Sequence, residues 1–213
     1  MYRVQRSGRF KGSTSSNIAL AIEASKLHEV ITGAPLAAWL TVAGSPAGTF
    51  GWTSWVETLD QLATRNDQLI ASAIWGKLED KAANVATEWS VDQIAQVIVV
   101  PGVLGKVAQP GSRVLQSMVR ANQTADPMEM LQWATKMAEV TDRVSGGSAG
   151  LSQCGFGPDW GTYNFSQLYP DAKALDAGVA RSMASAEYLS VFMEGRKYVD
   201  ISSMRRAMMV KIA

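Results

Sequence analysis

The chain carries the same short phrase twice, as AGSPAGTFGW from Ala43 and as FGPDWGTYNF from Phe156. Aligned at a spacing of 113 residues, two glycines, a threonine and the aromatic residue after it coincide without a gap. Glycine permits positive φ, and aromatic or β-branched runs on both sides of a short Gly/Pro turn are typical of a β-hairpin. A repeat of this kind constrains the fold strongly, because both copies must form the same unit.

The residues around each hairpin predict the rest of the unit. Asp126-Pro127, with Glu129 two positions further on, reads as a helix N-cap, a proline at the first helical position and a capping-box glutamate. Thr58 and Asp171 coincide at the start of the second helix of each copy, where both can cap it. Each copy therefore reads strand, helix, two strands, helix, strand, which is the ferredoxin-like βαββαβ unit.

The predicted fold class is α+β, with two tandem ferredoxin-like repeats over residues 1–100 and 113–213. A Gly/Pro-rich linker, residues 101–112, separates them. Helices cover one face of each antiparallel sheet, and the other face needs cover. Two copies in one chain can supply that cover to each other, so we expect them to pack sheet to sheet as a single-chain α/β barrel.

Composition excludes several classes of partner. The 213 residues have 47% hydrophobic content and a formal net charge of +1, which is ordinary for a globular core and disfavours a nucleic-acid or anionic-membrane binder. No apolar run reaches the roughly 20 residues that span a bilayer. We expect a cytoplasmic protein with no nucleic-acid and no membrane partner, and its assembly into a homo-oligomer stays open. Cys154 is the only cysteine, which excludes an intramolecular disulfide.

Few residues are candidates for catalysis. His28 is the only histidine, and its place on the first helix favours a surface position over a role as general base. A three-histidine metal site is impossible, and nothing in the spacing joins His28 to Cys154. The sequence assigns no catalytic residue and no metal ligand.

Alternation along the strands divides residues between the two faces of the sheet. In the run LAAWLTVA, the even-numbered positions from Leu36 are all aliphatic and are predicted to face the helices. Trp39 and Thr41 are then predicted to face the barrel, and their counterparts in the second copy are Ser152 and Cys154. We expect any cavity to lie nearer these smaller residues. Plain core packing is the alternative role for the tryptophans.

The element order and the phrase WTSWVETLDQL, from Trp52, resemble the dimeric α/β-barrel superfamily, which includes the antibiotic-biosynthesis-monooxygenase-like and stress-responsive families. The resemblance implies that Trp55 lies near the lumen. It also singles out Asn122, which falls on Arg9 at the repeat spacing, because some cofactor-free oxygenases of the superfamily keep an asparagine in such a place. Haem-degrading members bind iron through a histidine on the second helix, and both second helices here lack one. We therefore expect no cofactor.

Two functions stay open. In the first, the lumen binds a small apolar or aromatic molecule, and the resemblance implies activity as a cofactor-independent monooxygenase-like enzyme. In the second, the barrel is a structural or interaction module filled by its own side chains. The predicted ligand-binding residues are Trp39, Thr41, Trp55, Asn122, Ser152 and Cys154.

Overall fold

The computed structural model describes residues 1–213 except 90–91, 101, 103–107 and 158. The first half of the chain has the predicted order of elements, with its second helix and its last strand each in two pieces. Its elements are β1 (Tyr2–Phe10), α1 (Thr14–Thr32), β2 (Ala37–Ala43), β3 (Thr49–Val56), α2 (Leu59–Ile70), α3 (Ala73–Val85), β4 (Ala86–Trp89) and β5 (Gln93–Val99).

The second half repeats this order with one long final strand. Its elements are β6 (Arg113–Ala121), α5 (Pro127–Ser145), β7 (Ser148–Phe156), β8 (Thr162–Tyr169), α6 (Ala172–Ala184), α7 (Ala186–Glu194), a short 3-10 turn (Gly195–Lys197) and β9 (Val199–Lys211). Half of the predicted linker, 101–112, falls outside the described residues, and the exact domain limits remain a prediction.

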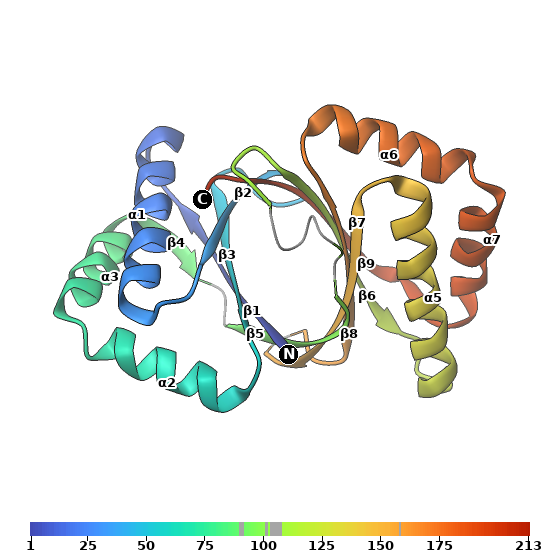
Figure 1. Cartoon of the computed structure of the whole chain (residues 1–213), viewed down its shortest axis with the longest axis horizontal. Helices are drawn as coiled ribbons and strands as arrows, with labels where there is room; N and C mark the ends of the chain where they lie inside the picture. The colour runs from blue at the N-terminus through green and yellow to red at the C-terminus, as the bar shows by residue number, and fades with distance from the viewer. Residues whose placement is uncertain (90–91, 101, 103–107, 158) are drawn as a thin grey trace.

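Eight strands close into a barrel between two groups of helices (Figure 1). Each half contributes four neighbouring strands, in the order β5-β1-β3-β2 and β9-β6-β8-β7, and all the pairings are antiparallel. The two halves join at two seams, where β5 pairs with β7 and β2 pairs with β9. Strand β4 extends the sheet beside the end of β1. This is the predicted fold of two ferredoxin-like repeats in one α/β barrel.

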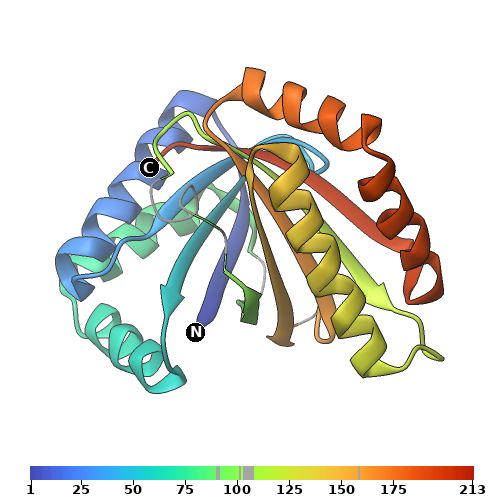
Figure 2. The same cartoon turned by 45° about the vertical axis from the view of Figure 1, so that its right-hand side comes forward.

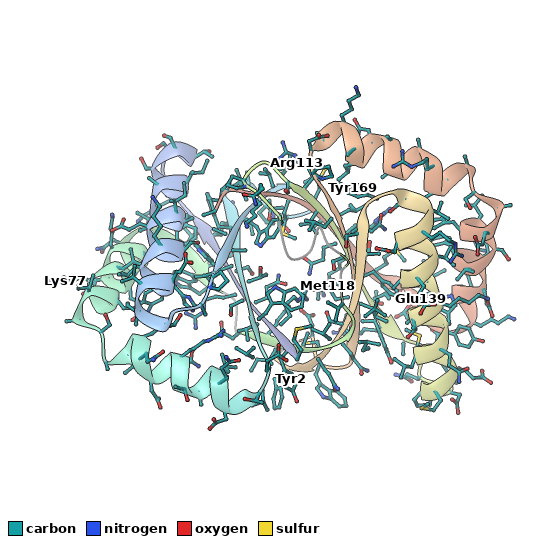
Figure 3. All side chains as sticks on the ribbon, in the orientation of Figure 1. Tyr2, Lys77, Arg113, Met118, Glu139 and Tyr169 are labelled. Carbon is teal, nitrogen blue, oxygen red and sulfur yellow. The ribbon has the colours of Figure 1, made fainter. Side chains whose placement is uncertain are left out.

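Helices cover the outer face of the barrel on both sides, as the turned view in Figure 2 shows. In the first half, Leu20 and Ala21 of α1 pack with Ala38 and Phe50 on the sheet. In the second half, α5 buries Met130, Trp133 and other residues against the sheet and α7. Figure 3 shows side chains filling these layers and entering the barrel. Among the described residues, no helix is long and apolar enough to cross a membrane.

The repeated phrase forms the hairpin turns, as predicted. Gly44 and Gly48 in the first half, and Gly157 and Gly161 in the second, all have positive φ. At Gly44 a Cβ would lie 1.9 Å from the Arg206 carbonyl oxygen, so this position has neither the backbone angle nor the space for another residue.

The predicted helix caps are also present. Thr58 and Asp171 each accept a hydrogen bond from a backbone N–H in the first turn of α2 and α6. Asp126 accepts bonds from two such groups of α5, and Pro127 occupies the first turn. The second helix of each half breaks at a serine, Ser72 or Ser185, whose side chain caps the piece that follows.

The gap-free spacing of 113 residues is wrong for the first strands. Arg9 lies opposite Thr49 on β3, and the residue opposite Thr162 on β8 is Arg120. The equivalent of Arg9 is therefore Arg120, at a spacing of 111, and not Asn122. The cause is a longer connection, because residues 122–126 link β6 to α5 where residues 11–13 link β1 to α1.

Candidate functional site

A cavity of about 420 Å³ lies inside the barrel, at the end where β1 and β6 begin and β3 and β8 finish. Its wall comes from both halves of the chain. The side chains that determine its chemistry are Arg3, Gln5, Trp39, Trp55, Gln116 and Lys211. This size is within the range of small-molecule sites.

Two tryptophans form the aromatic wall. Trp39 on β2 is 9% exposed, and its Nε1 donates a hydrogen bond to Thr53 Oγ1 at 2.9 Å. Trp39 also packs with Val114 and Leu168 from the second half. Trp55 on β3 lines the same cavity but is 36% exposed, which places it where the cavity meets solvent. The hydrogen bond fixes the plane of Trp39, so the wall is formed before any ligand arrives.

Two glutamines meet across the lumen. Gln116 Nε2 on β6 donates to Gln5 Oε1 on β1, with 3.3 Å between the two atoms. These residues occupy equivalent positions in the two halves, because the structure relates β1 to β6 at a spacing of 111. Both line the cavity, and the bond links the two sheets across its interior.

Two cationic side chains line the same cavity. Arg3 on β1 is 9% exposed, and its Nε has no hydrogen-bond partner among the described residues. Burial lowers the pKa of the Arg3 guanidinium to about 10, against a small opposing effect of Cys154. Lys211 on β9 donates from Nζ to the Ala108 carbonyl at 2.6 Å, and burial also lowers its pKa. No aspartate or glutamate is among the described residues that line the cavity.

The other predicted barrel residues are not among the described residues that line this cavity. Ser152 and Cys154 are buried on β7, and Thr41 lies opposite Met209 on β9. Cys154 Sγ donates to the Phe156 carbonyl at 3.1 Å, and burial raises the pKa of its thiol. The cavity therefore borders Trp39 and Trp55, whereas the sequence placed the open space nearer Ser152 and Cys154. A role of all three in binding remains a prediction.

Asn122 lies just beyond the end of β6. Its Nδ2 donates to the Lys197 carbonyl at 3.2 Å, and its backbone N–H donates to the Tyr198 carbonyl at 2.8 Å. These bonds tie the end of β6 to the turn before β9. Among the described residues that line the lumen cavity, Asn122 does not appear. The buried asparagine of the sheet is Asn164 on β8, whose Nδ2 and Oδ1 have no partner in the described part of the chain.

His28 is buried, which corrects the expectation of a helix-surface position. Its Nδ1 bonds to the Ala34 carbonyl at 3.0 Å, and the Trp75 ring of α3 lies 6.3 Å from the imidazole, centroid to centroid. The break at Ser72 lets α3 cover this face of α1, which the sequence pattern did not reveal. Burial lowers the pKa of His28 and keeps the ring neutral. Within the described residues, no group of three His, Cys, Asp or Glu side chains could hold a metal ion.

Sequence reasoning missed Arg3, Gln5, Gln116 and Lys211. One signal in the sequence could have found Arg3. Val4 and Phe10 both occupy even-numbered positions of β1, so the even-numbered positions are expected to face the core under the helices. The odd-numbered positions then face the lumen. Nothing in the sequence brings Lys211 to Arg3, since their strands come together only when the barrel closes.

Two larger cavities, of about 550 and 510 Å³, lie between the helices and the outer face of the sheet, one in each half. They are lined mostly by hydrophobic side chains of the two cores. The lumen cavity is smaller than either, but it combines an ordered aromatic wall with two cationic side chains that make no ion pair in the described part of the chain. We therefore take the lumen as the candidate site.

The comparisons with known proteins agree on the fold. A structure described as "Putative monooxygenase" from Fusobacterium nucleatum matches with a TM-score of 0.73 and 7% identity, over 100% of this chain and 92% of that one. Another of that description, from Lactobacillus acidophilus, gives 0.70 and 14% over 100% and 93%. An anthrone oxidase-like protein gives 0.65 and 9% over 100% and 91%. These matches show the dimeric α/β-barrel fold alone. No family model and no curated protein sequence matches the chain.

Proposed function

We propose that the barrel lumen binds a small aromatic molecule against Trp39 and Trp55. The observation that carries the proposal is the open cavity with a preformed aromatic wall. Aromatic rings pack favourably on one another, by about 0.5–1.5 kcal/mol beyond the area they bury. An open space of this size also weighs against the alternative of a barrel filled by its own side chains.

Gly51 offers a way to fill the cavity without disturbing the strand. It lines the lumen on β3, and a Cβ there would have the Arg6 carbonyl oxygen, at 3.8 Å, as its nearest neighbour. Gly155 on β7 is a matched control, since a Cβ there meets the Ile94 carbonyl oxygen at the same 3.8 Å. Gly155 is exposed and is not among the described residues that line the cavity.

The first prediction is that Gly51→Leu abolishes binding of two-ring aromatic probes and Gly155→Leu does not. Binding of 2-naphthoate and 2-naphthamide is followed by quenching of tryptophan fluorescence and by calorimetric titration. The wild-type chain is expected to bind one probe molecule per chain. Gly51→Leu is expected not to bind, because the leucine side chain would occupy the space that the ring takes. Equal binding to wild type and Gly51→Leu would place the site elsewhere.

The activity that we propose for this site is oxidation of a bound aromatic molecule by O₂ without a cofactor. Two of the similar structures bear the name monooxygenase and a third is called anthrone oxidase-like, and these names support this class of reaction. Oxygen uptake in the presence of an anthrone tests it. Uptake above the spontaneous rate by wild type and Gly155→Leu, but not by Gly51→Leu, supports an enzyme. If all three proteins show only the spontaneous rate of oxygen uptake, the site binds the molecule without oxidising it.

A further inference from the structure

Two arginines on the same strand have opposite electrostatic surroundings. Arg6 faces the helix side of β1, where Nε and Nη2 bond to the two carboxylate oxygens of Asp92 at 2.6 and 2.7 Å. Arg3 faces the lumen, and no ion pair in the described part of the chain includes it. The exposed arginine therefore has a counter-ion and the buried one has none.

The described surroundings of Arg3 supply no negative charge. Its cross-strand neighbours are Trp55 on β3 and Ala95 on β5. Among the described residues, the group that interacts with its charge is the Cys154 thiol, and burial raises the pKa of that thiol, so it stays neutral. Lys211 adds a second cation to the cavity wall and bonds to a neutral carbonyl. The described wall carries positive charge alone.

An unpaired buried charge is costly, and proteins retain one where a ligand supplies the partner. Arginine is suited to this, because its planar donors match a carboxylate in two parallel hydrogen bonds. Trp55 on β3 is the cross-strand neighbour of Arg3, and both side chains line the lumen cavity. A ligand whose aromatic ring packs on Trp55 would therefore have its substituent near the guanidinium.

We propose that the ligand of the lumen is an aromatic anion, a carboxylate or a phenolate, whose charged group pairs with Arg3 while its ring packs on the tryptophan wall. This inference rests on the proposed function and adds the charge of the ligand to it. Lys211 on β9 lines the same cavity and adds a second positive charge to the site.

The test compares two probes of the same shape and different charge, 2-naphthoate and its neutral amide, by calorimetric titration of the full chain at pH 7. The anion is expected to bind at least ten-fold more tightly than the amide. In Arg3→Met, which keeps an unbranched side chain of similar length, the affinity for the anion is expected to fall to that for the amide. Thermal melting confirms that the variant is folded.

Arg9→Met is the matched control. Arg9 is on the same strand and has the same parity as Arg3, but it is exposed and is not among the described residues of the cavity wall. It should keep the full preference for the anion. A preference that survives Arg3→Met, or that Arg9→Met removes equally, would overturn the assignment to Arg3.

Other outcomes separate the inference from the function on which it rests. Equal binding of both probes to the wild type would overturn the anion inference and leave aromatic binding in place. Binding of neither probe would overturn the proposed function, and the inference with it.

Discussion

At the scale of single residues, Arg3 is the side chain that distinguishes the lumen, and its burial destabilises the folded protein. Burial removes water from the Arg3 guanidinium, whose Nε has no partner among the described residues, and this is why the pKa of Arg3 falls to about 10. Natural cores seldom keep such a group. Where they do, the cost in stability often accompanies a role in binding or catalysis.

We expect Arg3→Met to raise the free energy of unfolding of the ligand-free protein by about 1–3 kcal/mol at pH 7. The unfolded chain binds the Arg3 proton more tightly than the folded chain, so the cost is fully present below pH 10 and is relieved as the pH rises above 10. The advantage of the variant should therefore shrink above pH 10. Urea unfolding at pH 7 and pH 10.5 measures both values. A variant less stable than wild type at pH 7 would show that the guanidinium is a structural group.

The sequence was more informative about turns and caps than about this residue. Glycines with positive φ and capping side chains act within a few positions of the chain, so Gly44, Gly161 and Asp126 could be interpreted locally. The environment of Arg3 depends on strands that lie about 50, 90 and 150 residues away. No local pattern records that a side chain is buried without a partner.

At the scale of elements, one connection decides how the two copies compare. The link from β6 to α5 has five residues where the link from β1 to α1 has three. Asn122 occupies the longer link and bonds to backbone carbonyls beyond α7, so this residue joins the end of β6 to the turn before β9. The repeat phrase predicted the hairpins and helices well. It failed for the first strands because an ungapped alignment has no means of representing an insertion.

The cap of α5 provides a prediction for this connection. Asp126→Ala should lower the free energy of unfolding by about 1 kcal/mol, because two N–H groups of the first turn lose their acceptor. Asp126→Asn should restore most of it. Asp176→Ala, at an exposed position inside α6, is the control for the loss of a carboxylate. Chemical denaturation followed by circular dichroism gives the values, and an unchanged Asp126→Ala would mean that solvent replaces the cap.

At the scale of the whole molecule, the barrel depends on pairing between the edge strands of the two halves. If the second half unfolded alone, β2 and β5 of the first half would lose their hydrogen-bonded partners, and unfolding of the first half alone would leave β7 and β9 without theirs. The seams also bury Ala95 of β5 opposite Cys154 of β7. The two ferredoxin-like units are therefore joined by main-chain bonds as well as by the chain between them.

This closure predicts one cooperative unfolding transition. Five of the seven tryptophans lie in the first half, so fluorescence reports mainly on that half, while far-ultraviolet circular dichroism reports on both. The two signals should give the same midpoint in urea. Separate midpoints would show that one unit survives the loss of the other.

The bond between Gln5 and Gln116 has a consequence for the internal symmetry of the molecule. Two equivalent residues meet there, yet an amide NH₂ can only donate and an amide oxygen can only accept. The pair must therefore choose a direction, and an identical pair could choose either one with equal energy. Here Gln116 of the second half donates and Gln5 of the first half accepts, so the two halves play different roles in this hydrogen bond. The two halves also differ in their side chains at equivalent positions of the barrel, because Trp39 in the first half corresponds to Ser152 in the second.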